Sequence, residues 1–306
     1  MRIIIIGRSE ILYETALQLR NEGHEIALIV TAKEAPEYTK NSDDFRVLAE
    51  QWEIPFIRTP LISRAVVTIN HLYPIDVGIS YNYTGIIPQS VIDLFPHGIL
   101  NAHGGDLPRY RGNACQSWAI LNGEEKVGLC IHRMIGGELD SGEIIARDYY
   151  PLSLNTKVTE VYAWMSNQIP VLFADALNQL EQDPKHVLEY QSKDPKDALR
   201  CYPRKPEDGR IDWTKSNIEI LRLINACNKP YAGAFCGFEG QKLIVWDAEL
   251  APKENFLAVP GQITFIGNNF IEVATSRGKL RIKEIGINGQ LIKPNIVCRS
   301  IRQRFT

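Results

Sequence analysis

The chain has 306 residues, of which 44% are hydrophobic and 23% charged, with a formal net charge of −2. This is the composition of a folded globular protein, and the length suggests about two domains of roughly 150 residues each. The near-neutral charge excludes a strongly basic nucleic-acid coat, and the apolar run 3–6 is far shorter than the ~20 residues of a membrane span. The six cysteines lack Cys-x-x-Cys spacing, so we expect a cytoplasmic protein with free thiols, no membrane partner and no metal.

The first half of the chain alternates short apolar segments with amphipathic ones. The expected strands are 2–6, 25–30, 54–57, 76–80 and 98–101, and the expected helices are 9–21, 42–52 and one opening at Pro88. This alternation predicts an α/β, Rossmann-like domain with a mostly parallel sheet and helices on both faces. Such sheets bind ligands beyond the carboxyl ends of their strands, which makes the segments 81–88 and 101–112 candidate binding loops.

The pattern changes after residue 127. Strands are expected at 128–132 and 143–147, followed by a helix over 156–180 that Pro170 should kink or divide. Residues 183–204 hold three prolines and many charges and are interpreted as a linker. Beyond them a helix (215–228) and short strands (243–246, 261–265, 270–274, 280–285) predict a small C-terminal β-rich barrel or sandwich.

The most informative segment is 101–112. Asn101 and His103, two residues apart on a strand, point to the same side, and an amide beside an imidazole suits a carbonyl oxygen that becomes negative during attack. A hydrogen-bonded loop histidine is the plain alternative for His103. For Asp140, which lies between glycines, an Asx-turn is the better explanation from the residues alone. His132, within an apolar strand, is interpreted as a hydrogen-bonded core histidine.

The first strand is followed by neither G-x-G-x-x-G nor a P-loop lysine, so a dinucleotide or ATP phosphate site is poorly supported there. The loop Tyr81–Pro88 offers apolar surface and backbone polar groups that suit a flat heterocycle, or it could simply pack.

Several motifs together resemble one known family. Asn101-x-His103, Leu107-Pro-Arg-Tyr-Arg-Gly112, His132-x-Met134 and Leu139-Asp-Ser-Gly142 are similar to the signature of 10-formyltetrahydrofolate-dependent formyltransferases. Segments 204–213, 230–235 and 260–261 resemble the small domain of the two-domain members, which act on sugars or on methionyl-tRNA. The resemblance implies an enzyme with a formyltransferase catalytic domain and linker over 1–203 and a small OB-like barrel domain over 204–306.

The resemblance implies that Asn101, His103 and Asp140 are catalytic, with 10-formyltetrahydrofolate as formyl donor and no metal. Asn101 and His103 would stabilise the oxyanion formed when an amine attacks, while Asp140 would orient His103 and help to accept the amine proton. The pteridine would lie between residues 81–88 and 136–140. The implied cofactor contacts are Tyr81, Tyr83, Ile86, Ile87, Gly137, Glu138, Leu139 and Asp140.

One departure from the family pattern lies next to His103. Gly104-Gly105 replaces the usual Pro-Ser, and Asp106 follows where an apolar residue is common. Two glycines loosen the loop and open space. We expect Asp106 either to face the amine-bearing substrate or to raise the pKa of His103.

Three acceptors fit the resemblance: a nucleotide-linked amino sugar of surface polysaccharide biosynthesis, methionyl-tRNA, and a small ribonucleotide amine. We favour the nucleotide sugar, because residues 31–45 hold two lysines against four acidic residues, a poor surface for a tRNA backbone. Basic residues near the C-terminus keep tRNA as the alternative partner, although charged strand edges explain them too. They are Arg277, Lys279, Arg281, Lys283, Arg299, Arg302 and Arg304.

Residues for the acceptor are assigned from side-chain chemistry. Arg109, Arg111, Arg204 and Lys205 are candidate diphosphate contacts, and Tyr231 could stack on a base. Arg111 could instead brace the catalytic loop, and Tyr231 could belong to the core. A formyltetrahydrofolate hydrolase and a non-catalytic folate-binding module are ranked lower, and a homodimer is a base-rate expectation.

Overall fold

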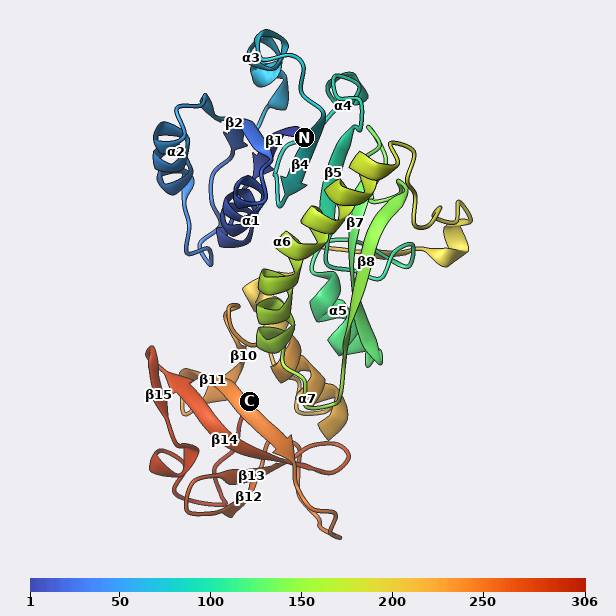
Figure 1. Ribbon diagram of the computed structural model, residues 1–306. Helices are drawn as coiled ribbons and strands as arrows, with labels where there is room; N and C mark the ends of the chain where they lie inside the picture. Colours follow the sequence, from blue (N-terminus) through green and yellow to red (C-terminus); the bar gives the residue numbers. More distant parts are fainter. The chain divides into compact units, whose positions relative to one another are not determined.

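The computed structural model describes all residues from 1 to 306, and the chain divides into two compact units (Figure 1). The first unit contains residues 1–115, 127–150 and 163–201, and the second contains 116–126, 151–162 and 202–306. Two segments that precede the predicted boundary at residue 203 therefore pack with the second unit. None of the helices combines the length and apolar character that a membrane crossing requires.

The first unit is built on a seven-stranded sheet with the order β3-β2-β1-β4-β5-β7-β8. The strands are β1 (Arg2–Gly7), β2 (Glu25–Thr31), β3 (Phe56–Arg58), β4 (Val77–Tyr81), β5 (Ile99–His103), β7 (Lys126–Arg133) and β8 (Ile144–Pro151). All pairs from β3 through β5 are parallel, while β7 runs antiparallel to β5. The predicted mostly parallel sheet is confirmed.

Burial explains why the first strand has no alternating pattern. All four isoleucines from Ile3 to Ile6 are completely buried, since the sheet is covered on both faces. Ile4 and Ile6 pack in one cluster with Leu28, Val30 and Ile99 of the neighbouring strands. The aligned strand ends place the loops after β1, β2, β4 and β5 along the same edge of the sheet.

The helices around this sheet are α1 (Glu10–Asn21), α2 (Ser42–Gln51), α3 (Val66–His71), α4 (Gln89–Ile92) and α6 (Val158–Gln182). The short helix α3 was not predicted. The division of the long helix at Pro170 is wrong, because α6 continues through that residue. Ile169 and Phe173 on either side of the proline are fully buried, and this packing compensates for the missing backbone hydrogen bond.

The predicted linker is more structured than its composition indicated. Within it, β9 (Leu199–Cys201) pairs in parallel with β6 (Tyr110–Gly112), which follows β5 in the chain. The side chain of Gln191, in the same segment, is buried. Residues 183–204 are mostly exposed, as a linker would be, but backbone pairing also ties part of them to the candidate site.

The second unit contains a six-stranded antiparallel sheet with the order β10-β11-β14-β13-β12, and β15 pairs with β14. The strands are β10 (Ala234–Phe238), β11 (Gln241–Leu250), β12 (Ile263–Ile266), β13 (Ile271–Ala274), β14 (Lys279–Ile287) and β15 (Gln290–Ile292). Helices α5 (Cys115–Asn122, apart from its first residue) and α7 (Asn217–Ala226) complete the unit. Of these strands, β10 and β15 were not predicted.

The C-terminal residues close this sheet into the predicted small barrel. Thr306 exchanges two backbone hydrogen bonds with Gly237 of β10, at 2.6 and 2.9 Å. On the other side, Phe305 N–H donates to the carbonyl of Gly261 at 2.9 Å, and Ile263 N–H of β12 donates to Gln303 at 3.2 Å. The last four residues therefore join the two edge strands.

Candidate active site

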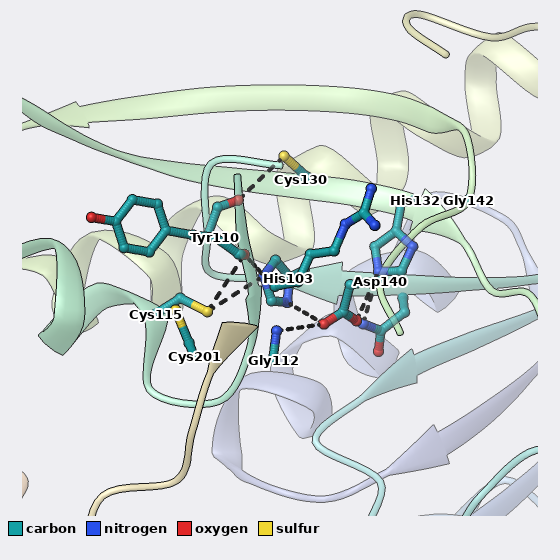
Figure 2. Close-up of polar contacts among 12 residues, drawn as sticks. His103, Tyr110, Gly112, Cys115, Cys130, His132, Asp140, Gly142 and Cys201 are labelled. Atoms are coloured by element: carbon teal, nitrogen blue, oxygen red, sulfur yellow. Dashed lines mark hydrogen bonds and ion pairs between the residues drawn. The ribbon is translucent and has the colours of Figure 1, made fainter. Parts of the chain in front are cut away.

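The candidate site lies in the first unit, where β5 meets β7. Asn101 and His103 are on β5, and the antiparallel register places His132 of β7 directly opposite Asn101. Asp140 comes from the loop between β7 and β8. Figure 2 shows the imidazoles of His103 and His132 converging on the carboxylate of Asp140 from two strands.

Asp140 is held between these two rings. Its Oδ2 lies 3.5 Å from Nδ1 of His103, and its Oδ1 lies 3.5 Å from Nε2 of His132. The backbone N–H of Gly112 donates to Oδ2 at 2.9 Å. Asn101 joins the group through His132, since its Nδ2 lies 3.3 Å from Nε2 of that ring. The structure thus brings Asn101, His103 and Asp140 into one cluster, with His132 at its centre.

The orientation of the His103 ring follows from its hydrogen bonds. Nε2 lies 2.6 Å from the carbonyl oxygen of Tyr110, and a carbonyl can only accept, so Nε2 carries the proton. In the neutral ring Nδ1 is then unprotonated and faces Asp140. Neither nitrogen presents a free N–H toward a substrate carbonyl.

Gly105 makes this position of His103 possible. A Cβ on residue 105 would lie 2.6 Å from His103 Nε2 and 2.5 Å from the Tyr110 oxygen, both too short for a real contact. The glycine that departs from the family pattern therefore has a steric consequence: it admits the buried imidazole beneath the loop.

The charge states of His103 and Asp140 follow from their burial and their neighbours. Burial lowers the pKa of His103, only partly offset by Asp140, so the ring is neutral at pH 7. For Asp140, burial raises the pKa, but the hydrogen bond from the Gly112 N–H favours the charged form, and the pKa lies well below the usual range. The site therefore holds an ionised carboxylate beside a neutral imidazole.

Asp106 does not act on His103 as predicted. Its carboxylate lies 3.5 Å from Nη1 of Arg147, whose Nη2 donates to the Leu107 carbonyl at 2.6 Å. The pKa of His103 is lowered, not raised. The prediction that Asp106 raises it is wrong, because a guanidinium faces that carboxylate; a contact of Asp106 with substrate stays a prediction.

Gln191 supports the loop that carries Asp140 through hydrogen bonds to its backbone. Its Nε2 donates to the carbonyls of Asp140 at 2.9 Å and Gly142 at 2.7 Å, and its Oε1 accepts from Arg111 Nη2 at 3.0 Å. The contacts of Arg111 are therefore those of a residue that braces this loop, which is the alternative that the sequence offered to a diphosphate contact. Sequence reasoning missed Gln191, which follows no motif. The interpretation of His132 as a buried, hydrogen-bonded histidine is confirmed, but its place beside Asn101 and Asp140 was not predicted.

The predicted folate residues form two loops that touch. Gly136 N–H donates to Gln89 Oε1 at 2.8 Å, which joins the first residue of α4, at the end of the loop after β4, to the loop carrying Asp140. Ile86 and Leu139 are the exposed apolar side chains, 86% and 40% accessible, whereas Tyr81 and Ile87 are buried. Tyr81 and Ile87 would therefore meet a ligand chiefly through their backbone.

The remaining folate candidates are less available as side chains. Tyr83 donates its hydroxyl to the Thr59 carbonyl at 2.7 Å, and burial raises the pKa of Tyr83 to about 12. Gly137 has a positive φ of 82°, and Glu138 accepts a hydrogen bond from Ser141 at 2.5 Å. These residues shape the two loops through local contacts.

The other acceptor candidates lie apart in the chain and are engaged locally. In the first unit the guanidinium of Arg109 stacks over the Tyr110 ring at 5.1 Å. In the second unit Arg204 lies over the Trp118 ring at 5.1 Å. In the same unit, the backbone N–H of Lys205 donates to Asp208 Oδ2 at 2.7 Å. The Tyr231 hydroxyl accepts from Gln116 Nε2 at 2.9 Å. Their contact with an acceptor stays a prediction.

A cleft that the sequence did not indicate lies at the carboxyl ends of the strands. Its volume is about 430 Å³. The lining residues are Arg8, Ala32, Lys33, Glu34, Arg58, Thr59, Pro60 and Thr84. Arg8 is fixed by hydrogen bonds to the carbonyls of Asn82 and Lys33, at 2.8 and 2.7 Å. We call this the β1–β4 cleft; it contains three cationic side chains and one carboxylate. No group of His, Cys, Asp and Glu residues has an arrangement that could hold a metal ion.

Comparison with known proteins shows which families and which relatives the chain is similar to. Residues 1–177 match the family described as "Formyl transferase", and residues 204–295 match "Formyl transferase, C-terminal domain". A methionyl-tRNA formyltransferase of Geotalea uraniireducens is 30% identical over 298 residues, which cover 95% of this chain and 91% of that protein. A methionyl-tRNA formyltransferase of Agathobacter rectalis is 29% identical over 294 residues, which cover 95% and 93%.

Solved structures share the fold. An N-formyltransferase from Helicobacter canadensis, in complex with folinic acid and dTDP-3-aminofucose, superposes with a TM-score of 0.66 at 17% identity, covering 92% of this chain and 98% of that one. HypX from Aquifex aeolicus, in complex with tetrahydrofolic acid, gives 0.63 at 18% identity over 98% of this chain. This chain spans about half of HypX, covering 47% of it. At these identities the likeness shows the fold alone.

Proposed function

Because the chain belongs to the formyl transferase family, whose members are folate-dependent formyl-transfer enzymes, we propose that it formylates the amine of a nucleotide-linked amino sugar with 10-formyltetrahydrofolate as donor. The two touching segments around Ile86 and Leu139 fit the donor, since they offer exposed apolar side chains to a flat heterocycle. The acceptor amine would attack the formyl carbon of the donor. The bond from that carbon to N10 then breaks, and N10 of the released tetrahydrofolate takes up the proton that the amine has lost.

The observation that carries the choice of acceptor is the β1–β4 cleft. Arg8, Lys33 and Arg58 face Glu34 as the single carboxylate in its lining, an excess of positive charge in a chain of net charge −2. Guanidinium and ammonium groups are the usual partners of phosphate oxygens. The cleft follows strand β1, which is separated from the catalytic strand β5 by β4 alone. A diphosphate there would leave its sugar within reach of Asn101.

Each residue of the cluster has a separate task in this proposal. Asn101 donates an amide N–H to the formyl oxygen as it becomes negative. Asp140 Oδ2 takes the proton that the amine loses and passes it to Nδ1 of neutral His103. The Nε2–H of His103 stays on the Tyr110 carbonyl and keeps the ring in the accepting tautomer. His103 is thus a proton acceptor here and not the second oxyanion donor that the sequence suggested.

Methionyl-tRNA is the second candidate acceptor, because relatives with that name are 29–30% identical over most of the chain. The basic residues of β14 offer little support for it. Lys279 pairs with Glu254 and Glu272, Arg281 with Glu249 and Glu272, and Lys283 with Asp247 and Glu249. These acidic partners neutralise the strand, which leaves little charge for a tRNA backbone.

The test is a panel of acceptors with purified protein. Formyltetrahydrofolate is mixed with nucleoside-diphosphate amino sugars, with methionyl-tRNA, or with no acceptor, and release of tetrahydrofolate is measured. We expect turnover with a nucleotide amino sugar. Turnover with methionyl-tRNA alone, weakened sharply by salt, would establish the second candidate instead, and equal turnover without acceptor would indicate a hydrolase.

Charge-removing variants test the cleft. Lys33→Gln and Arg58→Gln should each raise KM for the nucleotide sugar by roughly tenfold or more with little change in kcat, because a charge-assisted hydrogen bond contributes about 1.5–3 kcal/mol. Arg64→Gln, an exposed arginine outside the cleft lining, is the matched control. An unchanged KM in both cleft variants would remove the diphosphate from this cleft.

A further inference from the structure

We propose that His132 is a positioning residue that fixes the orientation of the Asn101 side-chain amide. It thereby makes that amide a hydrogen-bond donor toward the formyl oxygen. The inference deepens the formyl-transfer chemistry of the proposed function, but it does not depend on which amine is the acceptor.

The first step is the position of His132. The antiparallel register between β5 and β7 places it opposite Asn101, and its side chain is 2% exposed. Its ring lies edge-on to that of His103, with centroids 6.1 Å apart and an interplanar angle of 82°. A strand neighbour with a fixed register cannot slide, so the ring has one fixed place beside the amide.

The second step is its tautomer. Nδ1 of His132 lies 2.9 Å from the carbonyl oxygen of Arg133, and a carbonyl only accepts, so Nδ1 carries the ring proton. In the neutral ring Nε2 is therefore an acceptor. Asp140 Oδ1 also lies near Nε2, at 3.5 Å, but the amide nitrogen of Asn101 is the nearer neighbour, at 3.3 Å.

The third step concerns the amide itself. An amide has an accepting oxygen and a donating nitrogen, and the two are exchanged by a half-turn. Because Nε2 accepts, the favourable arrangement places Asn101 Nδ2 on it, at 3.3 Å. One amide hydrogen is used in this way, and the second remains for the substrate. With an apolar residue at position 132 the amide could turn and present its oxygen, which would repel the developing oxyanion.

A double-mutant cycle tests whether His132 acts through Asn101. His132→Met removes the acceptor at similar volume and should lower kcat by ten- to a hundredfold, with KM for the formyl donor changed less than threefold; loss of an oxyanion donor typically costs 10²–10³-fold. In an Asn101→Ala background the same change should cost less than twofold. His132→Gln, whose Oε1 can accept near the Nε2 position, should recover most of the rate.

The outcomes that overturn the proposal are specific. Equal losses from His132→Met with and without Asn101 would show a purely structural effect, and a fully active His132→Met enzyme would show no effect at all. If His132→Met does not fold, the kcat values of His132→Gln and His132→Asn are compared, since only glutamine reaches the Nε2 position. Equal kcat values would contradict the proposal. The cycle is run with whichever acceptor the wild type uses, so failure of the nucleotide-sugar proposal appears in the wild type alone.

A second measurement is independent of activity. Two-bond hydrogen–nitrogen correlation spectra of ¹⁵N-histidine-labelled protein at pH 7.5 distinguish the tautomers of each ring. We expect a proton on Nδ1 of His132 and a proton on Nε2 of His103, with the His132 resonances assigned from the His132→Gln variant. A proton on Nε2 of His132, alone or with one on Nδ1, would overturn the proposal, because Nε2 could then not accept from Asn101.

Discussion

At the scale of single residues, one glycine decides where the imidazole of His103 lies. His103 occupies space that any side chain at position 105 would fill, and its Nε2 is held by the Tyr110 carbonyl. The pair formed with Asp140 consequently has a buried neutral ring behind a carboxylate. The chemistry of the site thus depends on a residue that has no functional group.

Restoring the usual family residue should therefore be harmful here. Gly105→Ser introduces a Cβ 2.6 Å from His103 Nε2, so the ring must move. We expect a loss of about 1–3 kcal/mol in the free energy of unfolding, as for other overpacked sites, and a fall in kcat of at least tenfold. Urea denaturation and steady-state kinetics measure the two effects; a Gly105→Ser enzyme with normal values of both would show that His103 does not need this space.

The buried His103 also predicts how stability depends on pH. Burial lowers its pKa below the ordinary 6.5, so the unfolded chain takes up a proton at a higher pH than the folded chain. Its contribution to stability is complete above about pH 6.5 and is lost as pH falls through the folded pKa. Between about pH 6.5 and about 5.5 wild type should lose up to about 1.4 kcal/mol relative to His103→Gln.

Urea denaturation of both proteins at several pH values measures this difference. If wild type gained stability relative to His103→Gln as the pH fell, the ring would be stabilised in its charged form, and the proton-accepting role would be wrong.

At the scale of elements, strand pairing assembles the site from distant segments. The β5–β7 register places His132 beside Asn101, and the β6–β9 pairing draws residues near 200 to the loop that contains Gly112. Between these strands, Gln191 joins Arg111 to the backbone of the Asp140 loop. The segment that composition described as a linker is thus a support for the catalytic loop.

Removing the hydrogen bonds of Gln191 should loosen the loop that carries Asp140. Gln191→Leu leaves two buried carbonyls, those of Asp140 and Gly142, without their donor. We expect a loss of about 1–3 kcal/mol in unfolding free energy and a fall of at least tenfold in kcat. Lys193→Ala, at an exposed position in the same segment, is the control and should change neither quantity. Normal kcat in Gln191→Leu would show that Asp140 holds its place without the brace.

At the scale of the whole molecule, the second unit depends on its last residues. Phe305 is 3% exposed and its ring lies 5.5 Å from that of Trp213 and 5.2 Å from that of Phe238. The backbone on either side of this ring joins β10 to the segment before β12. The terminus therefore both closes the barrel and fills its core.

Phe305→Ala tests the importance of this closure. Truncating a buried phenylalanine typically costs about 3–5 kcal/mol, and we expect a loss of that size in the second unit, measured by thermal or urea unfolding. Arg302→Ala, an exposed neighbour in the same tail, should stay within about 0.5 kcal/mol of wild type. Equal stability of both variants would mean that the barrel closes without the tail.

The sequence by itself determined most elements of the first unit, the parallel sheet and the two strand-end loops, because apolar periodicity and turn residues are local properties. The family resemblance added Asn101, His103 and Asp140 as a set. The tertiary structure alone decided that His132 lies beside that set, that Gln191 and Arg111 brace it, and that cations from three separate segments line one cleft. These facts depend on strand register and on side-chain packing between segments far apart in the chain, which no local pattern encodes.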